Sequence, residues 1–318
     1  MQIQSALDAA SLQARSIEHL WWWMFGVGGA IWLAVIAAMF FALRAARGRR
    51  GSDDLQHVPA ESHKGLERVV SGAVIITVLV LTAFLVADYG VGRALAAHPS
   101  RALTIEVIGH QWWREVQYDD TNPSRRLITA NEIHIPTGEQ VQLKLSAADV
   151  IHSFWVPNLQ GKRDLIPGYT TTHWIKADKP GTYRGQCAEF CGLQHAKMAL
   201  HVVAESPAQF RAWFAQASTP NNPPSDSTSL YGQRVFLTAG CSVCHTIGGT
   251  TAQATIGPSL THFKSRATIA AGTLANTREN VEGWIANPQA IKPGTRMPAV
   301  PLKPAELTAL VSYLETLK

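Results

Sequence analysis

The chain has 318 residues, of which 46% are hydrophobic and 16% are charged, and its formal net charge is +5. The charged fraction lies below the ~25% of an average soluble domain, which indicates membrane-embedded segments. No run of basic residues alternates with aromatic residues, so the composition argues against nucleic-acid binding.

Two uncharged apolar runs, at about 21–43 and 69–87, predict a transmembrane hairpin within residues 1–98. Each is about as long as the ~20 residues that span a bilayer core, although a buried core helix is the alternative for either run. The short loop 44–68 is rich in arginine, whereas Arg15 is the one arginine of the N-terminal tail. The positive-inside rule therefore predicts a cytoplasmic loop, with both termini on the periplasmic or extracellular side of a bacterial cell membrane.

Residues 99–217 show a different pattern. Short segments rich in β-branched and aromatic residues are separated by turn signals such as Pro167-Gly168 and Pro180-Gly181. Apolar and polar residues alternate in 141–145. This pattern predicts a sandwich or barrel of antiparallel strands, ended by a short amphipathic helix over 208–217.

A cluster of possible metal ligands lies late in this region, in the segment Gly185–Met198. It contains Cys187, Cys191, His195 and Met198. Thiolate, imidazole and thioether ligands suit copper or zinc better than magnesium or calcium. His152, further upstream, is the candidate for a second histidine ligand. A structural zinc site and a Cys187–Cys191 disulfide are the alternatives.

Residues 218–228 are rich in Ser, Pro and Asn and predict an extended linker to a last domain, 229–318. Cys241-Ser242-Val243-Cys244-His245 matches the attachment signal for haem c, in which both thiols bind the haem and the histidine binds the iron. Met297 is the expected distal ligand, with His262 as the competitor. A His/Met pair suits an electron carrier. Helices are expected over 230–238 and 304–317.

Together, these motifs resemble subunit II of bacterial haem-copper cytochrome c oxidases of the caa type, which carry a fused C-terminal cytochrome c domain. The resemblance covers nearly the whole chain. It implies a multidomain protein with a transmembrane hairpin, an all-β cupredoxin-like Greek-key barrel and an all-α class I cytochrome c domain. It also implies a binuclear copper centre, CuA, with the ligands His152, Cys187, Glu189 (through its carbonyl), Cys191, His195 and Met198.

Further roles follow from the resemblance. The two cysteines would bridge the copper ions, and the Glu189 side chain would help bind magnesium at the contact with the catalytic subunit. Trp112 would relay electrons, and Glu67 would lie near the mouth of a proton channel. Arg114-Glu115 replace an aromatic residue that is usual in the family, which predicts an altered donor-docking surface. Gly257-Pro258 resembles the segment that packs on the proximal histidine, and Trp284 resembles the aromatic residue near the haem propionates.

The resemblance implies an oxidoreductase subunit that carries electrons, with oxygen reduced to water on the partner subunit I. The expected donor is cytochrome c or a quinol–cytochrome c reductase, and the expected surroundings are membrane lipid and other membrane subunits. Two alternatives stay open: the electron-entry subunit of a CuA-containing nitric oxide reductase, and a membrane-anchored electron carrier with no oxidase. Only the identity of the catalytic partner would separate the first from an oxidase, and co-purification would test the second.

Overall fold

The computed structural model describes residues 4–48, 61–95, 102–119 and 127–318. These residues fall into two compact units, one with residues 15–95 and one with the residues up to Ala14 together with those from 102 onward. Residues 49–60 of the loop expected at 44–68, and the domain boundary expected at 98/99, lie outside the described residues, whereas the two ends of that loop are helical.

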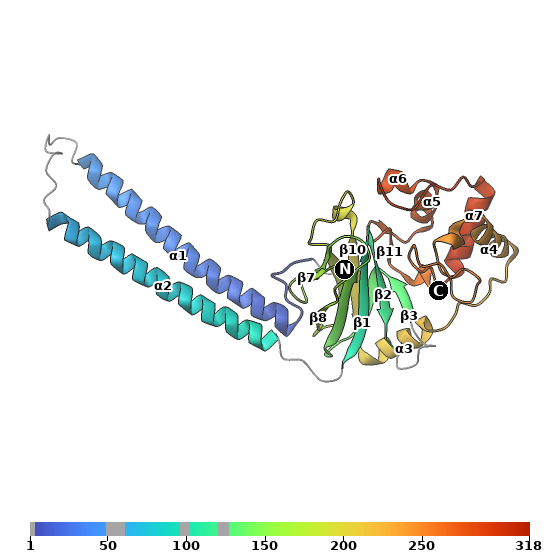
Figure 1. Cartoon of the computed structure of the whole chain (residues 1–318), viewed down its shortest axis with the longest axis horizontal. Helices are drawn as coiled ribbons and strands as arrows, with labels where there is room; N and C mark the ends of the chain where they lie inside the picture. Colours follow the sequence, from blue (N-terminus) through green and yellow to red (C-terminus); the bar gives the residue numbers. More distant parts are fainter. Residues whose placement is uncertain (1–3, 49–60, 96–101, 120–126) are drawn as a thin grey trace. The chain divides into compact units, whose positions relative to one another are not determined.

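The first two helices are long and apolar. Helix α1 spans Leu12–Gly48 and helix α2 spans Glu61–Leu95, and they run in opposite directions (Figure 1). The predicted segments 21–43 and 69–87 lie inside them. The candidate spans have mean hydropathies of 2.2 and 2.7, and no part of their apolar windows is buried by the rest of the chain. Side chains this apolar need a lipid or protein covering, so the two helices are candidate membrane spans, and they are not buried as core helices would be.

The middle of the chain forms two β-sheets and a separate short hairpin. The five-stranded sheet has the order β3-β2-β1-β5-β8, and the three-stranded sheet has the order β4-β10-β9. The strand bounds are β1 Leu103–His110, β2 Trp113–Tyr118, β3 Leu127–Ala130, β4 Glu132–Pro136, β5 Val141–Ala147, β6 His152–Phe154, β7 Arg163–Leu165, β8 Thr171–Ile175, β9 Gly181–Gln186 and β10 Ala199–Glu205. Strands β6 and β7 make the hairpin.

The core lies between the two sheets. Val141, Leu143 and Leu145 of β5 are fully buried, while the residues between them are more exposed, as the alternation in the sequence predicts. They pack in one cluster with residues of the other sheet, such as Ile133 and Val202. The predicted sandwich is therefore confirmed, and its rigid core supports the loops at its ends.

The prediction that all strands are antiparallel is wrong for two pairs. Strand β1 pairs in parallel with β5, and β4 pairs in parallel with β10. Each pair joins strands that are separated along the chain by several others, as in Greek-key connections. Alternation and turn signals report local hairpins, so they could not reveal these long-range pairings.

The segment before α1 and the helix after β10 both attach to the sandwich. The backbone of Ala10 donates to the carbonyl of Asn158 (2.8 Å) and accepts from the N–H of Asp178 (2.8 Å). At the other end, helix α3 (Pro207–Ala217) follows Ser206, whose side chain forms a capping box with Gln209. Helix α3 packs its aromatic side chains on the core.

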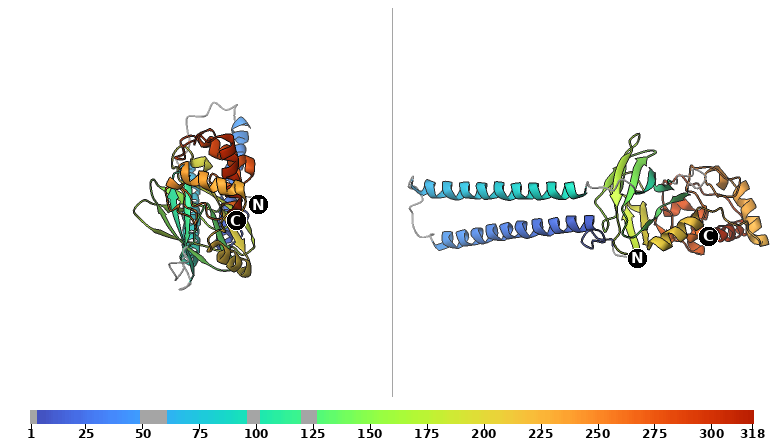
Figure 2. Two further views of the ribbon diagram at one scale, coloured as in Figure 1. Left: turned by 90° about the vertical axis from the view of Figure 1, so that its right-hand side faces the viewer. Right: turned by 90° about the horizontal axis from the view of Figure 1, so that it is seen from below.

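The C-terminal region is mainly helical (Figure 2). Its elements are α4 Ser227–Thr238, the 3₁₀ turns Cys241–Val243 and Phe263–Ser265, the short strands β11 Thr268–Ile269 and β12 Leu274–Ala275, and helices α5 Arg278–Ala286, α6 Pro288–Ile291 and α7 Pro304–Thr316. Helices α4 and α7 pack closely at Gly232, where an added Cβ would lie 2.0 Å from the carbonyl oxygen of Ala309. Helices α4 and α7 correspond to the helices expected over 230–238 and 304–317.

This contact predicts that Gly232→Ala destabilises the C-terminal domain by about 2–3 kcal/mol, because a backbone carbonyl blocks the new methyl group. Differential scanning calorimetry of the full chain should show the domain's transition at lower temperature. Gly283→Ala is the matched control. Nothing lies within 4 Å of a Cβ at that position in α5, so this variant should be neutral or gain up to about 1 kcal/mol. Equal effects of the two substitutions would contradict the interpretation.

Candidate copper centre and haem site

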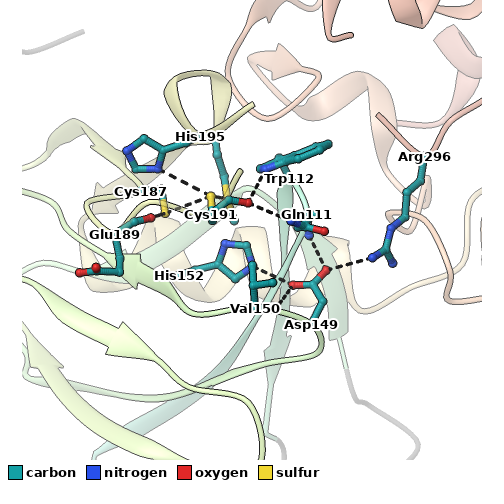
Figure 3. A network of polar contacts seen from close by, with 11 residues as sticks. Gln111, Trp112, Asp149, Val150, His152, Cys187, Glu189, Cys191, His195 and Arg296 are labelled. Atoms are coloured by element: carbon teal, nitrogen blue, oxygen red, sulfur yellow. Dashed lines mark hydrogen bonds and ion pairs between the residues drawn. The ribbon is translucent and has the colours of Figure 1, made fainter. Parts of the chain in front are cut away.

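Four soft ligand atoms converge at one end of the sandwich (Figure 3). The sulfur of Cys191 lies 3.8 Å from that of Cys187, 3.6 Å from Nδ1 of His195 and 3.9 Å from Sδ of Met198. The sulfur of Cys187 lies 3.2 Å from the carbonyl oxygen of Glu189. A disulfide has an S–S distance of ~2.05 Å, so the two cysteines are free thiols in this structure.

His152 completes this cluster from strand β6. One ligand atom from each of His152, Cys187 and Cys191 lies within 4.8 Å of the others, and all three residues are buried. Nε2 of His152 contacts Oδ1 of Asp149 at 2.9 Å, whereas its buried Nδ1 makes no hydrogen bond to the described residues. An unsatisfied buried nitrogen beside two thiols fits a metal ligand, because a metal bond would satisfy it.

The strand opposite His152 requires a glycine. A Cβ at Gly109, near the end of β1, would lie 2.7 Å from Cδ2 of the His152 ring. The carboxylate of Asp149 also accepts from the N–H groups of Gln111 and Val150, each at 2.8 Å. Partial burial raises the pKa of Asp149, but the hydrogen bonds with His152 and these N–H groups outweigh it and lower that pKa. An ionised Asp149 therefore orients the ring of His152.

The two thiols influence each other's ionisation. The hydrogen bond from Cys191 lowers the pKa of Cys187, and burial opposes this only in part. A thiolate at Cys187 in turn raises the pKa of Cys191. The two pKa shifts are opposite in direction, so ionisation of one thiol disfavours ionisation of the other. Metal binding would remove the second proton, because thiolates and not thiols are the ligands.

Arg114 is a residue of this site that the sequence prediction misjudged. It was expected on a donor-docking surface with Glu115, but both side chains are buried. The Arg114 guanidinium donates to the carbonyls of Ser153 (2.9 Å) and Met198 (3.3 Å), beneath the sulfur cluster. Burial lowers the pKa of Arg114 to about 10. Arg114 is therefore an internal cation near two thiols, and not a surface charge.

Trp112 lies against the same cluster. Its Nε1 donates to the carbonyl of Cys191 at 2.9 Å, and the side-chain amide of Gln111 donates to that carbonyl at the same distance (Figure 3). Gly192 has φ +107°, and a Cβ there would lie 3.2 Å from the Trp112 ring. The left-handed glycine thus lets the cysteine loop close over the indole.

The second predicted site surrounds a cavity of about 210 Å³ that is lined by residues of the C-terminal domain and of the sandwich. Cys241, Cys244, His245 and Met297 all line it, together with Trp284. This common lining fits a haem that is attached by the two thiols and ligated by the histidine and the methionine.

The proximal histidine is oriented as predicted from Gly257-Pro258. Nδ1 of His245 contacts the carbonyl oxygen of Pro258 at 2.7 Å, so this nitrogen donates and Nε2 is left as the nitrogen with a lone pair. A Cβ at Gly257 would lie 2.7 Å from Cε1 of the same ring. The glycine and the carbonyl therefore form a cradle for the imidazole.

Two further histidines do not suit these ligand roles. His262 has both ring nitrogens occupied, Nδ1 by the carbonyl of Lys318 (2.6 Å) and Nε2 by that of Thr219 (2.9 Å). It is not among the residues that line the large cavity. His134 contacts Glu132 and Glu205 at 3.1 and 3.2 Å. The competing axial ligand is thereby disfavoured.

Comparison with known proteins agrees with both sites. The family model for the periplasmic domain of cytochrome c oxidase subunit II matches residues 119–206, and the cytochrome c model matches residues 229–318. Cytochrome c oxidase subunit 2 of Alkalihalophilus pseudofirmus is 36% identical over 293 residues, which cover 89% of this chain and 82% of that protein. This chain belongs to the cytochrome c oxidase subunit II family.

Two further similar proteins are also subunit II proteins. The subunit 2 of Bacillus sp. strain PS3 is 30% identical over 292 residues, which cover 86% of this chain and 80% of the relative. The periplasmic domain of the Bradyrhizobium japonicum subunit II has a solved structure that is 30% identical, covers 37% of this chain and 95% of that one, and gives a TM-score of 0.35.

Membership in the subunit II family decides between the functional alternatives. The chain is an electron-entry subunit of a haem-copper terminal oxidase, with CuA in the cupredoxin-like domain and haem c in the C-terminal domain. The structural zinc site, the nitric oxide reductase subunit and the unattached carrier are therefore not supported. The cupredoxin-like domain is periplasmic, and the protein is a membrane protein.

The cradle around His245 predicts the effect of Gly257→Ala in this subunit. The new methyl group would displace the imidazole and weaken its bond to iron, at a cost of about 1–3 kcal/mol. Visible and EPR spectra of the full chain should show haem that stays covalently attached but loses its low-spin, two-ligand form. Gly283→Ala, in the same domain, should leave the spectra unchanged. Low-spin haem in Gly257→Ala at the wild-type level would refute the cradle.

Proposed function

We propose that this subunit takes up electrons on a haem c bound by Cys241, Cys244, His245 and Met297, and delivers them by way of CuA to the catalytic subunit that reduces oxygen. The observation that carries this proposal is the position of Trp112. Trp112 is among the residues that line the haem cavity, and its Nε1 donates to the carbonyl of Cys191 at 2.9 Å. One residue thus borders both sites, which supports its role as the relay between them.

The copper ligands in this proposal are His152, Cys187, Glu189 through its carbonyl, Cys191, His195 and Met198. When bound, a copper pair bridged by two thiolates shares one electron between both metals, and a haem with His and Met ligands accepts and releases one electron. The buried, unbonded Nδ1 of His152 and the 3.8 Å separation of the two sulfurs support these assignments.

The chain's own residues prepare the copper site. Asp149 and Gly109 fix the ring of His152, so that its free nitrogen lies beside the thiols. The two cysteines and Met198 are 4%, 3% and 1% exposed, which keeps water from the sulfurs. Such outer contacts orient ligands and tune the metal they bind. The site therefore needs little rearrangement when an electron arrives.

The outer face of the copper loop supports its contact with the catalytic subunit. Phe190 and Leu193 flank Cys191 and are 78% and 79% exposed. Large apolar side chains exposed together typically mark a protein interface. We assign the neighbouring Glu189 carboxylate to a magnesium site at this contact. In the free chain it pairs with Lys162 at 2.8 Å, so the metal would have to displace that ammonium group.

The remaining assignments concern the membrane. We place the arginine-rich loop 44–68 in the cytoplasm and the N-terminus with the two folded domains on the periplasmic side. Glu67 lies near the start of α2, exposed, and we assign it to the mouth of the partner's proton channel. Cytochrome c or a quinol–cytochrome c reductase is the proposed donor, and subunit I with other membrane subunits are the proposed partners.

Metal content tests the ligand assignments. The full chain, produced with copper and a haem c maturation system, should contain about two copper ions and about one haem iron, with EPR that shows an electron shared by a copper pair. Cys187→Ser should abolish this copper signal and leave haem content unchanged, because the haem site lies in another domain. Zinc, or a single-copper signal, in the wild-type chain would refute the ligand assignments.

The relay role of Trp112 makes a separate prediction. In the assembled oxidase, Trp112→Phe should slow electron transfer from haem c to copper by roughly tenfold or more, because the Nε1 hydrogen bond to Cys191 is lost. Flash-induced reduction of the haem followed by absorbance would measure this rate. Trp213→Phe is the matched control. The ring of Trp213 stacks on that of His134, with 3.9 Å between the ring centroids, and Trp213 lies away from both sites. An unchanged rate in Trp112→Phe would remove the relay.

A further inference from the structure

A buried lysine of the haem domain has its ammonium group among three carbonyl oxygens. Lys292 is 2% exposed, and its Nζ lies 2.9 Å from the carbonyl of Lys197, 3.0 Å from that of Trp112 and 3.2 Å from that of Ala270. An ammonium group has three N–H donors and no acceptor, so it matches three carbonyls. Two of these carbonyls belong to the copper domain and one to the haem domain.

The two copper-domain carbonyls lie next to the proposed electron path. Trp112 donates to the carbonyl of the copper ligand Cys191, and Lys197 precedes the copper ligand Met198. On the other side, Lys292 lies five positions before the haem ligand Met297. A single ammonium group thus connects backbone segments that adjoin ligands of both sites.

The third carbonyl comes from a strained turn. Ala270 and Ala271 lie between β11 and β12 and have φ values of +52° and +56°, a conformation that is unfavourable for alanine. Both carbonyls are used at the domain contact: that of Ala270 accepts from Lys292, and that of Ala271 accepts from the N–H of Ala199 (2.9 Å). Such strain persists when surrounding contacts require it.

Other contacts of the same segment agree with this arrangement. The amide of Gln194 donates to the carbonyl of Pro293 at 2.6 Å. Arg296 forms an ion pair with Asp149 (3.5 Å), the carboxylate that orients His152 (Figure 3). The contact surface between the domains is therefore built largely from specific polar bonds, which are sensitive to register.

We propose that Lys292 is a positioning residue that fixes the haem domain on the copper domain in the pose that transfers electrons. This inference rests on the proposed function. The buried ammonium group sets the distance and orientation between Trp112 and the haem pocket, and the linker alone would not set them. Burial and the charges of Lys197 and Arg114 lower the pKa of Lys292 to about 7, so the ammonium form depends on the three carbonyls for its stabilisation.

Electron transfer in the assembled oxidase tests this role, with Lys292→Met compared to Lys303→Met. Lys303 is an exposed lysine of the same domain and serves as the control. Lys292→Met removes the three N–H donors, so the haem domain should lose its fixed pose on the copper domain. Electron transfer from haem c to copper after flash reduction should then slow by roughly tenfold. The rate should also become dependent on viscosity and salt, because the domain must dock again before each transfer. Lys303→Met should behave as wild type.

The copper content, the haem content and the low-spin form of the haem should be unchanged in Lys292→Met, since the hydrogen bonds of Nζ go to backbone carbonyls. If Lys292→Met reduces copper or haem content, the transfer rate and its viscosity dependence are measured in Lys292→Gln instead. This variant keeps part of the hydrogen bonding, and its transfer should also be slower than that of the wild type. A wild-type rate without viscosity dependence would overturn the positioning role. If the wild-type chain itself showed no transfer from haem to copper, the proposed function would fail, which is a different result.

Discussion

The close approach of two cysteine sulfurs, 3.8 Å apart in a buried loop, is the constraint on which the copper domain depends. Without metal, the pair can carry one negative charge, and the second thiol stays protonated beside the first. Metal ions satisfy both sulfurs as thiolates, together with the unbonded nitrogen of His152. The sandwich supplies the framework: β6 presents His152, and Met198 lies directly before β10. Ligands placed on or beside strands keep their geometry better than ligands on free loops, which explains why an electron-transfer site needs this rigid core.

Motifs carried by short stretches of chain were predictable from the sequence. The cysteine–histidine–methionine segment and the haem attachment signal depend on spacing within a few residues, and alternation along β5 marks its buried face. Arg114, Asp149 and Lys292 were not predicted, because their roles come from partners far away in sequence. In a single sequence, a charged pair at 114–115 predicts exposed side chains. Only the fold shows that the Arg114 guanidinium donates to the carbonyl of Met198. The parallel pairings of β1 with β5 and of β4 with β10 were missed for the same reason.

The membrane part explains why this chain works only within a larger assembly. The apolar spans 21–43 and 69–87 contain no histidine, so they offer no imidazole to a haem within the bilayer. Their side chains are uncovered by the rest of the chain, and lipid or other membrane subunits must cover them. Phe190 and Leu193 expose further apolar surface beside the copper loop. The chain thus delivers electrons at a surface that suits contact with a partner subunit. The reduction of oxygen takes place on that partner.

Fusion of the haem domain serves two separable purposes. A tether raises the effective concentration of the donor, which favours encounter but does not choose an orientation. The chain just after α3 also contacts the haem domain, because the carbonyl of Thr219 accepts a hydrogen bond from Nε2 of His262 (2.9 Å). Orientation comes from the polar contact around Lys292, where an ammonium group needs all three of its acceptors at once. Buried polar bonds of this kind contribute less to affinity than apolar area does, but they disfavour every shifted register, because a shift would leave a charge unsolvated. For an interface that serves electron transfer, a single fixed orientation of the two domains matters more than tight binding.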